Sequence, residues 1–424
     1  MERFRIQGPS RLAGTVRASG AKNAALPVLA ASLLSDEAIE LANVPEVRDI
    51  RTMGRLLEHL GVAVESPAEG RRRLRWTGPY SSAHDAPYEV VKTMRASVLV
   101  LGPLLARHGR ARVSLPGGCA IGVRPIDQHL KGLEALGAEI ELDHGDVSVR
   151  AERLTGGRFR FSTPTVGGTE NLLMAAVLAR GTTVLENCAR EPEIVDLANL
   201  LTAMGGRIEG AGESTITIEG VESLGGAQHT IIPDRIEAGT YLIGAALTSG
   251  DVTVTDSRAA DLAPLLEKLA EAGATVDAAE ALIRVRGNGG LRPTSIDTEP
   301  HPGFPTDLQA QYMAMLTRTE GVSKVCELVF ENRFQHVQEL ARMGADIRVD
   351  GNCAEIHGPT PLTGAHVMAT DLRASASLVL AGVAAEGETI VHRIYHLDRG
   401  YARMESKLQD LGARVERFNV PMGQ

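Results

Sequence analysis

Residues 56–65 read LLEHLGVAVE, a short helix that ends in glycine and leads into an alternating strand, and this pattern recurs along the chain. The other copies are residues 133–141 (LEALGAEIE), 200–209 (LLTAMGGRIE), 265–277 (LLEKLAEAGATVD), 340–349 (LARMGADIRV) and 408–416 (LQDLGARVE). Glycine at a helix end supplies the left-handed backbone that stops the helix. The glycines are separated by 76, 68, 68, 71 and 68 residues. This spacing predicts six structural repeats of about 70 residues each.

An earlier helix in each repeat supports the same period. These helices are expected within residues 95–106, 171–179, 238–247, 308–317 and 372–385, and turns follow at Gly109, Gly181, Gly250, Gly321 and Gly387, with Ser35-Asp36 at the turn of the first repeat. They are apolar nearly all round, which predicts that they are buried, whereas the later helices carry charge on one side and should face water. Pro233-Asp234-Arg235 opens the fourth repeat. The chain should therefore form two halves, and clefts between domains are preferred ligand sites.

Composition limits the class of protein. The 424 residues are 43% apolar and 23% charged, with a net charge of -9 and only 3% aromatic residues. The acidic balance and scarce aromatic residues disfavour nucleic acid and anionic membranes as partners. Four scattered cysteines lack zinc or dithiol spacing and fit a reducing compartment. Residues 24–34 resemble a secretory apolar segment, but the long preceding segment does not, so a cytoplasmic location is expected.

One loop combines a thiol with glycines and an arginine. Residues 115–129 read LPGGCAIGVRPIDQH, so Cys119 is followed after four intervening residues by Arg124. Glycines let backbone amides approach an anion closely, and arginine can bind phosphate or carboxylate with two donors. Phosphatases of the Cys-x5-Arg type need one more intervening residue. A buried structural thiol is the other alternative, although such thiols usually lie on apolar elements.

Charged residues cluster at expected helix starts. Lys22 and Asn23 precede an apolar helix, which indicates either a bound anion or a solvated lysine. Asp307 enters a helix behind two prolines, where it is either a helix cap or a functional carboxylate. Arg373 lies in an Asp-x-Arg corner that has the same two interpretations. His129 and His301 lack a metal-binding pattern, so no metal site is expected.

Together these segments resemble the enolpyruvyl transferase family, in particular its branch that acts on UDP-N-acetylglucosamine. The matching segments are SGAKNAALP (19–27), VKTMRAS (91–97), LPGGCAIGVRPID (115–127), REPEIVD (190–196), FPTDLQAQ (304–311), FENRF (330–334), ATDLRASASLVLAG (369–382) and YHLDRGY (395–401). The resemblance implies an α/β fold of two inside-out α/β barrel domains, each of three repeats. The expected domains are residues 22–232, and residues 1–21 together with 233–424, with the active site in the cleft between them.

The resemblance also implies roles for individual residues. The expected catalytic residues are Cys119, Asp307, Lys22 and Arg399. Phosphoenolpyruvate would be bound by Lys22, Asn23, Arg124, Arg333, Arg373 and Arg399. UDP-N-acetylglucosamine would be bound by Asn23, Arg95, Arg124, Pro125, Ile126, Asp127, Gln128, Thr165, Val166, Gly167, Asp307 and Val329. Thr163-Pro164 departs from the family, which often has a lysine there for the diphosphate.

The implied reaction is addition followed by elimination at C2 of phosphoenolpyruvate. Asp307 would act as base for the 3-hydroxyl of the sugar, and Cys119 as acid toward C3. A covalent adduct on Cys119 is also expected, since thiols attack electrophiles. No cofactor and no metal are expected. A transferase acting on shikimate phosphate and a catalytically silent UDP-sugar-binding relative are the alternatives; the first has a GSKS-type segment and no catalytic cysteine.

Overall fold

The computed structural model describes residues 2–78, 85–86, 88–91, 94–114 and 126–419. The chain forms two compact units. The N-terminal domain comprises the described residues from Gly20 to Ile232, and the C-terminal domain comprises those up to Ser19 together with those from Pro233 onward. Cys119, Arg124 and Pro125 lie outside the described residues.

In the described part of the N-terminal domain, three four-stranded sheets form the outside, one for each repeat. In spatial order their strands are β14 (Ala227–Thr230), β3 (Ile39–Ala42), β5 (Arg72–Trp76) and β4 (Val62–Glu65); β6 (Asp85–Ala86), β7 (Arg110–Ser114), β9 (Asp146–Arg150) and β8 (Glu139–Asp143); and β10 (Arg158–Arg160), β11 (Thr182–Glu186), β13 (Thr215–Glu219) and β12 (Arg207–Glu209). Its helices are α1 (Lys22–Ala30), η1 (Ala31–Leu34), α2 (Arg48–His59), α3 (Tyr88–Val91), η2 (Arg95–Val100), α4 (Leu101–His108), α5 (Asp127–Ala135), α6 (Val166–Ala176) and α7 (Pro192–Ala203).

The C-terminal domain repeats this plan. Its sheets are β16 (Thr275–Ala279), β17 (Leu282–Arg286), β15 (Asp251–Thr255) and β2 (Ala13–Arg17); β18 (Ser295–Asp297), β19 (Gly321–Cys326), β21 (Cys353–Gly358) and β20 (Asp346–Asp350); and β22 (His366–Met368), β23 (Gly387–His392), β1 (Glu2–Gly8) and β24 (Arg414–Asn419). Its helices are α8 (Arg235–Leu247), η3 (Ala259–Leu262), α9 (Ala263–Glu271), η4 (Thr306–Leu308), α10 (Gln309–Leu316), α11 (His336–Arg342), α12 (Leu372–Ala384), η5 (Ile394–Arg399) and α13 (Met404–Asp410).

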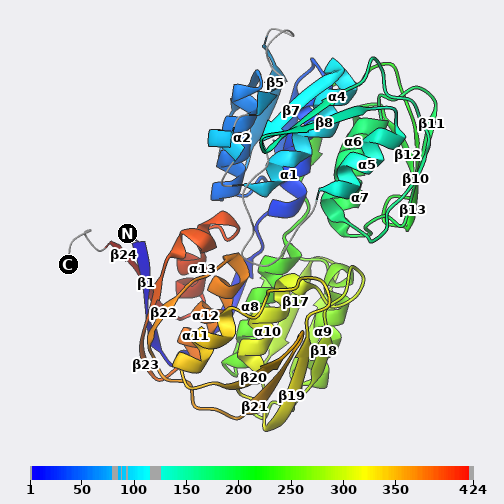
Figure 1. The fold of residues 1–424 in the computed structure, drawn as a ribbon. Coiled ribbons are helices and arrows are strands. Elements are labelled where there is room, and N and C mark those ends of the chain that lie inside the picture. Colours follow the sequence, from blue (N-terminus) through cyan, green and yellow to red (C-terminus); the bar gives the residue numbers. More distant parts are fainter. Residues whose placement is uncertain (1, 79–84, 87, 92–93, 115–125, 420–424) are drawn as a thin grey trace. The chain divides into compact units, whose positions relative to one another are not determined.

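Helices fill the centre of this domain and sheets form its outside. Helices α8, α10 and α12 contact one another in the middle of the domain (Figure 1), and all residues of α10 are buried. Apolar side chains all round each helix explain this position, because each face meets either another helix or a sheet. The predicted inside-out α/β fold of three repeats per domain is confirmed.

The repeat glycines have the predicted backbone. Gly61, Gly137, Gly205, Gly273, Gly344 and Gly412 have φ between 92° and 105°. In the earlier turn, Gly109, Gly181, Gly321 and Gly387 also have positive φ. Gly250 differs, because the preceding Ser249 takes the left-handed conformation with φ 50°. A Cβ atom on Gly250 would lie 2.0 Å from the Leu12 carbonyl oxygen, so a close backbone approach explains glycine there.

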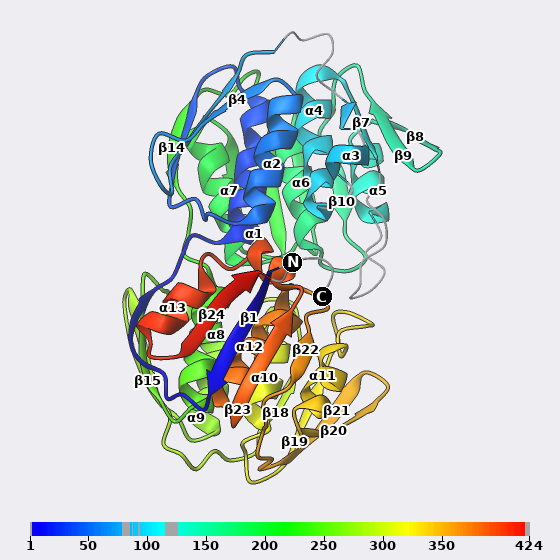
Figure 2. The ribbon, with the colours of Figure 1, turned by 90° about the vertical axis from the view of Figure 1, so that its left-hand side faces the viewer.

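Strands from distant parts of the chain complete three of the sheets. The N-terminal strand β1 pairs in antiparallel register with both β23 and β24, and Figure 2 shows this blue strand among the orange and red ones. Strand β2 pairs in parallel with β15, and β14 with β3. The N-terminal residues therefore belong to two different sheets of the C-terminal domain.

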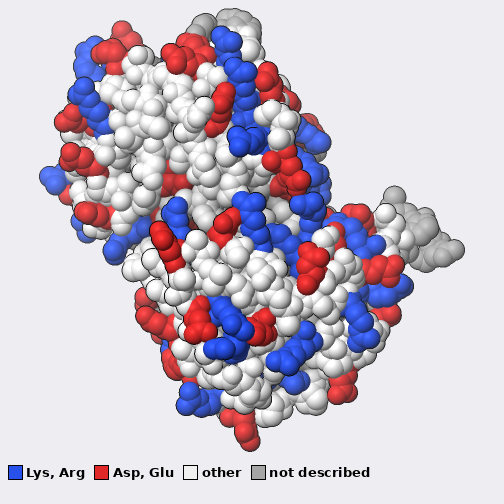
Figure 3. Space-filling view, turned by 180° about the vertical axis from the view of Figure 1, so that it is seen from behind, with Lys and Arg blue, Asp and Glu red and all other residues white. Residues whose placement is uncertain are grey.

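The outer faces of the sheets carry ion pairs between neighbouring strands. Arg284 and Asp251 pair at 2.7 Å, and Arg5 pairs with Glu416 at 3.0 Å. On the face shown in Figure 3, basic and acidic side chains accordingly lie next to one another. Within the described part of the chain, no helix combines the length and apolar character needed to cross a bilayer.

Candidate active site

Asp307 lies between two arginines in the C-terminal domain. Its two carboxylate oxygens each accept a hydrogen bond of 2.7 Å, one from Arg333 Nη2 and one from Arg373 Nη2. The arginine side chains are only 5% and 4% exposed, whereas Asp307 is 24% exposed. Asp307 accepts no backbone hydrogen bond at the start of η4, so it is not the helix cap that the sequence left open.

The electrostatics of this cluster follow from burial and charge. Burial alone raises the pKa of a carboxyl group, but Arg373 and Arg333 outweigh it and hold the pKa of Asp307 well below its usual value. Burial lowers the pKa of Arg373, and Asp307 reverses this effect, so the net shift is upward. The cluster is therefore fully ionised and holds one more positive than negative charge.

The local structure explains how the two arginines reach Asp307. Asp371 caps α12 by accepting hydrogen bonds from the amides of Arg373 and Ala374, which places Arg373 in the first turn. The Asp-x-Arg corner is thus a cap that also directs an arginine. Arg333 lies beyond β19, where its Nη1 donates a 2.7 Å hydrogen bond to the hydroxyl of Thr306.

A polar network continues from Asp307 into the domain core. Gln311 donates hydrogen bonds to the Asp307 carbonyl oxygen at 3.0 Å and to the hydroxyl of Tyr401 at 3.1 Å. The Tyr401 hydroxyl also bonds Thr240 at 2.8 Å, and the Arg373 guanidinium lies 5.6 Å from the centre of the Tyr401 ring. Arg399 is the last residue of η5, in the same domain. These contacts connect Asp307 and Arg373 to buried side chains of the domain core.

The N-terminal domain holds Lys22 at the start of α1. Lys22 Nζ lies 3.5 Å from the Asp49 carboxylate on α2, and both side chains are mostly buried. The sequence suggested an anion beside Lys22, and the structure supplies a carboxylate from the chain itself. Asn23 follows Lys22 in α1, and Arg95 begins η2 of the same domain.

Part of the set expected to bind the uridine diphosphate lies at the starts of two neighbouring helices in this domain, α5 and α6. Gln128, in α5, accepts a 2.6 Å hydrogen bond from the Ser162 amide and donates one of 3.0 Å to the Thr163 hydroxyl. Thr165 caps α6 by accepting from the Gly168 amide at 3.3 Å. Six of the expected residues lie at these starts: Ile126, Asp127, Gln128, Thr165, Val166 and Gly167.

His129 lies between these two helix starts and explains their close packing. Its Nδ1 is 3.1 Å from the Asn171 amide nitrogen, and a Cβ atom on Gly167 would lie 3.3 Å from the His129 ring. Burial lowers the pKa of His129 to about 4, against the opposing effect of Asp127 and with that of Arg95. His129 is therefore neutral near pH 7 and accepts the hydrogen bond. Helix N-termini bind anions, so the paired starts can hold a diphosphate.

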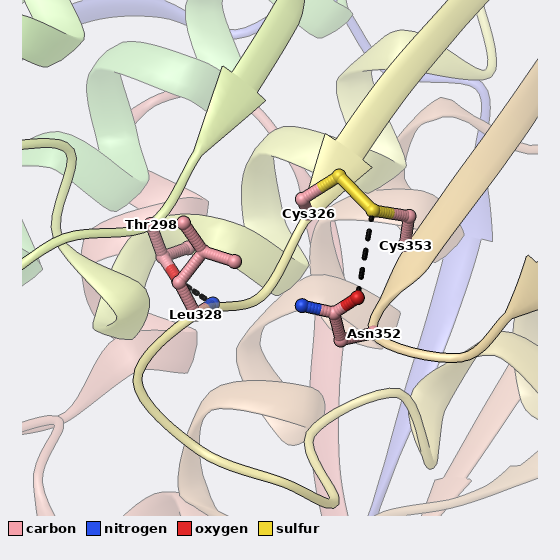
Figure 4. Close-up of a disulfide and its surroundings, with 5 residues drawn as sticks. All are labelled: Thr298, Cys326, Leu328, Asn352 and Cys353. Carbon is pink, nitrogen blue, oxygen red and sulfur yellow. Dashed lines mark hydrogen bonds between the residues drawn. A yellow bond between two sulfur atoms is a disulfide. The ribbon is translucent and has the colours of Figure 1, made fainter.

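A disulfide lies beside the loop that carries Arg333. Cys326 and Cys353, which face each other on β19 and β21, are joined, and Asn352 lies next to the Cys353 sulfur (Figure 4). This disulfide contradicts the expectation, drawn from their scattered spacing, that the cysteines stay reduced, because Cys326 and Cys353 meet only when β19 pairs with β21. Cys188 is a free, buried cysteine, and burial raises its pKa to about 12. Among the described residues, no group of three or more metal-ligating side chains is arranged to hold a metal ion.

Three residues that contact the candidate residues or their partners escaped sequence reasoning: Asp49, Thr306 and Glu327, whose carboxylate accepts a 2.8 Å hydrogen bond from the Thr306 hydroxyl. Thr306 precedes Asp307 in the matched segment 304–311, so that segment could have drawn attention to it. Asp49 and Glu327 have no such signal, because a single carboxylate in a helix or after a strand is common. The partners of these carboxylates depend on how the elements pack.

The described residues define an α/β protein of six repeats in which two buried arginines hold a carboxylate in the C-terminal domain. Residues 6–408 match the EPSP synthase (3-phosphoshikimate 1-carboxyvinyltransferase) family, and the chain belongs to this family of enolpyruvyl transferases.

The relatives and neighbours divide by degree of similarity. The chain is 59% identical to the UDP-N-acetylglucosamine 1-carboxyvinyltransferase of Anaeromyxobacter dehalogenans, over 98% of this chain and 99% of that protein. It is 55% identical to the protein of the same name from a Psychrobacter species, over 99% of this chain and 97% of that protein. The crystal structure of the enolpyruvyl transferase NikO from Streptomyces tendae matches with a TM-score of 0.88 and 27% identity over 99% of both chains. EPSP synthase from Acinetobacter baumannii shares the fold, with a TM-score of 0.77 and 19% identity over 99% of this chain and 100% of that one.

Proposed function

We propose that the chain transfers the enolpyruvyl group of phosphoenolpyruvate to the 3-hydroxyl of UDP-N-acetylglucosamine, with release of phosphate. This reaction is the first committed step of peptidoglycan synthesis, and it takes place in the cytoplasm. Relatives at 55% to 59% identity are UDP-N-acetylglucosamine 1-carboxyvinyltransferases, which supports this sugar nucleotide as the acceptor of the transferred group. The observation that carries the mechanism is the ionised Asp307 between two buried arginines.

The carboxylate of phosphoenolpyruvate binds Arg333 and Arg373, because a planar carboxylate matches the paired donors of guanidinium groups. Lys22, Arg124 and Arg399 bind its phosphate, with Asn23 beside them. Arg95, Asp307 and Val329 contact the sugar nucleotide.

The diphosphate binds at the paired starts of α5 and α6. The first amides of a helix have no hydrogen-bond partner within that helix, and Gln128 holds the two segments together. The contacts come from Arg124 to Gln128 and from Thr165 to Gly167. These amides take the role of the family lysine that Thr163-Pro164 replaces.

Binding of phosphoenolpyruvate activates Asp307. In the free protein both arginines bind Asp307, which makes the carboxylate a weak base. The substrate carboxylate then takes the two guanidinium groups, and the pKa of Asp307 rises toward the range of an effective general base. Asp307 is therefore available to accept a proton once phosphoenolpyruvate is present.

The reaction then runs in two steps. Asp307 takes the proton of the sugar 3-hydroxyl, the oxygen attacks C2, and the Cys119 thiol gives its proton to C3. In the second step the Cys119 thiolate takes a proton back from C3 while the bond between C2 and the phosphate oxygen breaks, so the double bond forms again in the product. Asp307 gives its proton to the departing phosphate. The surrounding cations stabilise the phosphate and the developing negative charge. No metal, organic cofactor or nucleic acid takes part.

Phosphate release from phosphoenolpyruvate tests this function, since it must depend on UDP-N-acetylglucosamine. Cys119→Ser should lose most turnover, and a thiol-directed epoxide should modify Cys119. Full activity with shikimate 3-phosphate and none with UDP-N-acetylglucosamine would contradict the proposal. Binding of UDP-N-acetylglucosamine without turnover would instead favour a silent sugar-nucleotide-binding protein.

A further inference from the structure

Glu327 is a buried carboxylate that joins three segments of the C-terminal domain. It follows β19 directly and is 3% exposed. Its Oε1 accepts hydrogen bonds from the Thr298 hydroxyl at 2.8 Å and from the amides of Val329 at 3.0 Å and Phe330 at 3.1 Å. Its Oε2 accepts a 2.8 Å hydrogen bond from the Thr306 hydroxyl. All four donors are neutral, so Glu327 organises backbone and hydroxyl groups rather than an ion pair.

The direction of each hydrogen bond is determined by the chemistry of the partners. A hydroxyl has a single hydrogen, and Thr306 donates it to Glu327. The Thr306 oxygen is then left as an acceptor toward Arg333 Nη1, which can only donate. Thr298 is used in the same way, because it donates to Glu327 and accepts from the Leu328 amide at 2.9 Å (Figure 4).

Glu327 therefore has two arms that reach the substrate-binding residues. The first arm runs through Thr306 to Arg333 and on to Asp307. The second arm holds the loop amides of Val329 and Phe330, and the Phe330 ring lies 5.1 Å from the Arg333 guanidinium. Both ends of the segment from Val329 to Arg333 thus depend on one carboxylate.

We propose that Glu327 is a positioning residue that sets Arg333 for the phosphoenolpyruvate carboxylate and the Val329 backbone for the sugar nucleotide. This proposal rests on the function proposed above. Glu327→Gln introduces an NH2 group that must face either the three donors on the Oε1 side or the Thr306 hydroxyl. One of the two sets of hydrogen bonds must therefore be lost, because every partner of Glu327 donates a hydrogen and an NH2 group cannot accept it.

Steady-state kinetics separate the two arms. Glu327→Gln should raise KM for both substrates about 10-fold and lower kcat/KM for phosphoenolpyruvate by about 10- to 100-fold, the loss that a misplaced binding group produces. Thr306→Val removes only the first arm and should raise KM for phosphoenolpyruvate alone. Thr306→Ser keeps the hydroxyl, so its KM for phosphoenolpyruvate should match that of the wild type. The double variant that combines Glu327→Gln with Thr306→Val should bind phosphoenolpyruvate no more weakly than Glu327→Gln alone, since both changes break one chain of contacts.

Ile356→Val is the matched control, because Ile356 is buried in the same sheet and the change loosens packing without touching the network. Equal KM changes in Ile356→Val, additive losses in the double variant, or unchanged KM values in Glu327→Gln would each overturn the positioning role.

Hydrogen exchange of the Val329 and Phe330 amides tests the same role without any turnover. Exchange should be more than about 10-fold faster in Glu327→Gln than in the wild type and unchanged in Ile356→Val. Equal protection of these amides in Glu327→Gln would refute the proposal. Absence of turnover in the wild type would instead refute only the proposed function, because amide exchange does not depend on it.

Discussion

Replacement of Asp307 by asparagine should separate the binding of phosphoenolpyruvate from its turnover. Asp307 holds Arg333 and Arg373 through two hydrogen bonds of 2.7 Å in the free protein. The proposed mechanism requires the substrate carboxylate to displace Asp307 from both. An asparagine amide has no charge and one acceptor oxygen, so at least one buried guanidinium would lose its partner until an anion binds.

The size of the effect follows from these two contacts. A hydrogen bond to a charged group contributes about 1.5–3 kcal/mol net, and the 24% exposure of Asp307 favours the lower figure. Loss of one or both contacts therefore removes about 1.5–3 kcal/mol that the substrate carboxylate otherwise has to overcome. This corresponds to roughly 10- to 100-fold tighter binding of phosphoenolpyruvate. Loss of the general base should meanwhile lower kcat by about 10²- to 10⁴-fold.

Isothermal titration calorimetry in the presence of UDP-N-acetylglucosamine measures the affinity of wild type and Asp307→Asn for a ligand that carries the same carboxylate and phosphate. Phospholactate, the saturated analogue that lacks the C2–C3 double bond, serves for both proteins because neither can transfer it. Asp346→Asn is the control, since Asp346 is an exposed carboxylate that pairs with Arg348 at 3.6 Å on β20. Unchanged or weaker binding by Asp307→Asn would refute the competition between Asp307 and the substrate carboxylate, whatever happens to kcat.

Two further predictions concern stability. The Cys326–Cys353 disulfide closes a segment with a sequence separation of 27, so a reductant should lower the free energy of unfolding by up to about 3–4 kcal/mol in urea titrations; equal midpoints with and without reductant, together with four titratable thiols, would contradict this pairing. His129, whose pKa is lowered to about 4 by burial, stays neutral in the folded protein while the unfolded chain binds a proton below about pH 6.5. The stability due to neutral His129 is thus present above that pH and is lost between about pH 6.5 and 4, by at most about 3 kcal/mol. His129→Gln should flatten this part of the curve of unfolding free energy against pH, and identical pH profiles for wild type and His129→Gln would count against this reasoning.

Local signals explain why the repeats were predictable. A helix that ends in glycine and leads into a strand is specified by adjacent residues, so Gly61 and Gly412 could be assigned from sequence alone. The buried position of the earlier helices followed from their apolar patterns. The prediction that the later helices turn their charged side to water was wrong for α7, where Glu193 and Asp196 are buried. The pairing of the edge strands was harder to predict. Strand β14 pairs with β3, which lies almost 190 residues earlier in the chain, and no residue next to β14 indicates that partner.

The sequence indicated which residues belong to the candidate site, but not which of them form ion pairs with one another. Asp307, Arg333 and Arg373 were all selected from sequence, yet their mutual ion pairs depend on three elements that meet only after folding. Lys22 was expected beside an anion, and the anion in the free protein is Asp49. Cys326 and Cys353 are directly opposite across two strands, a relation that their scattered spacing did not reveal.

The central position of β1 affects the order of events during biosynthesis. Residues 2–8 leave the ribosome long before their partner β24, which ends at Asn419. At about 5–20 residues per second, the stretch from Ile232 to Asn419 takes roughly 10–40 s to translate. During that interval the N-terminal domain can already fold, while β1 waits with both backbone edges unpaired. Residues 2–8 therefore need protection throughout that interval, and an extension fused before Glu2 would act on the sheet that β24 completes.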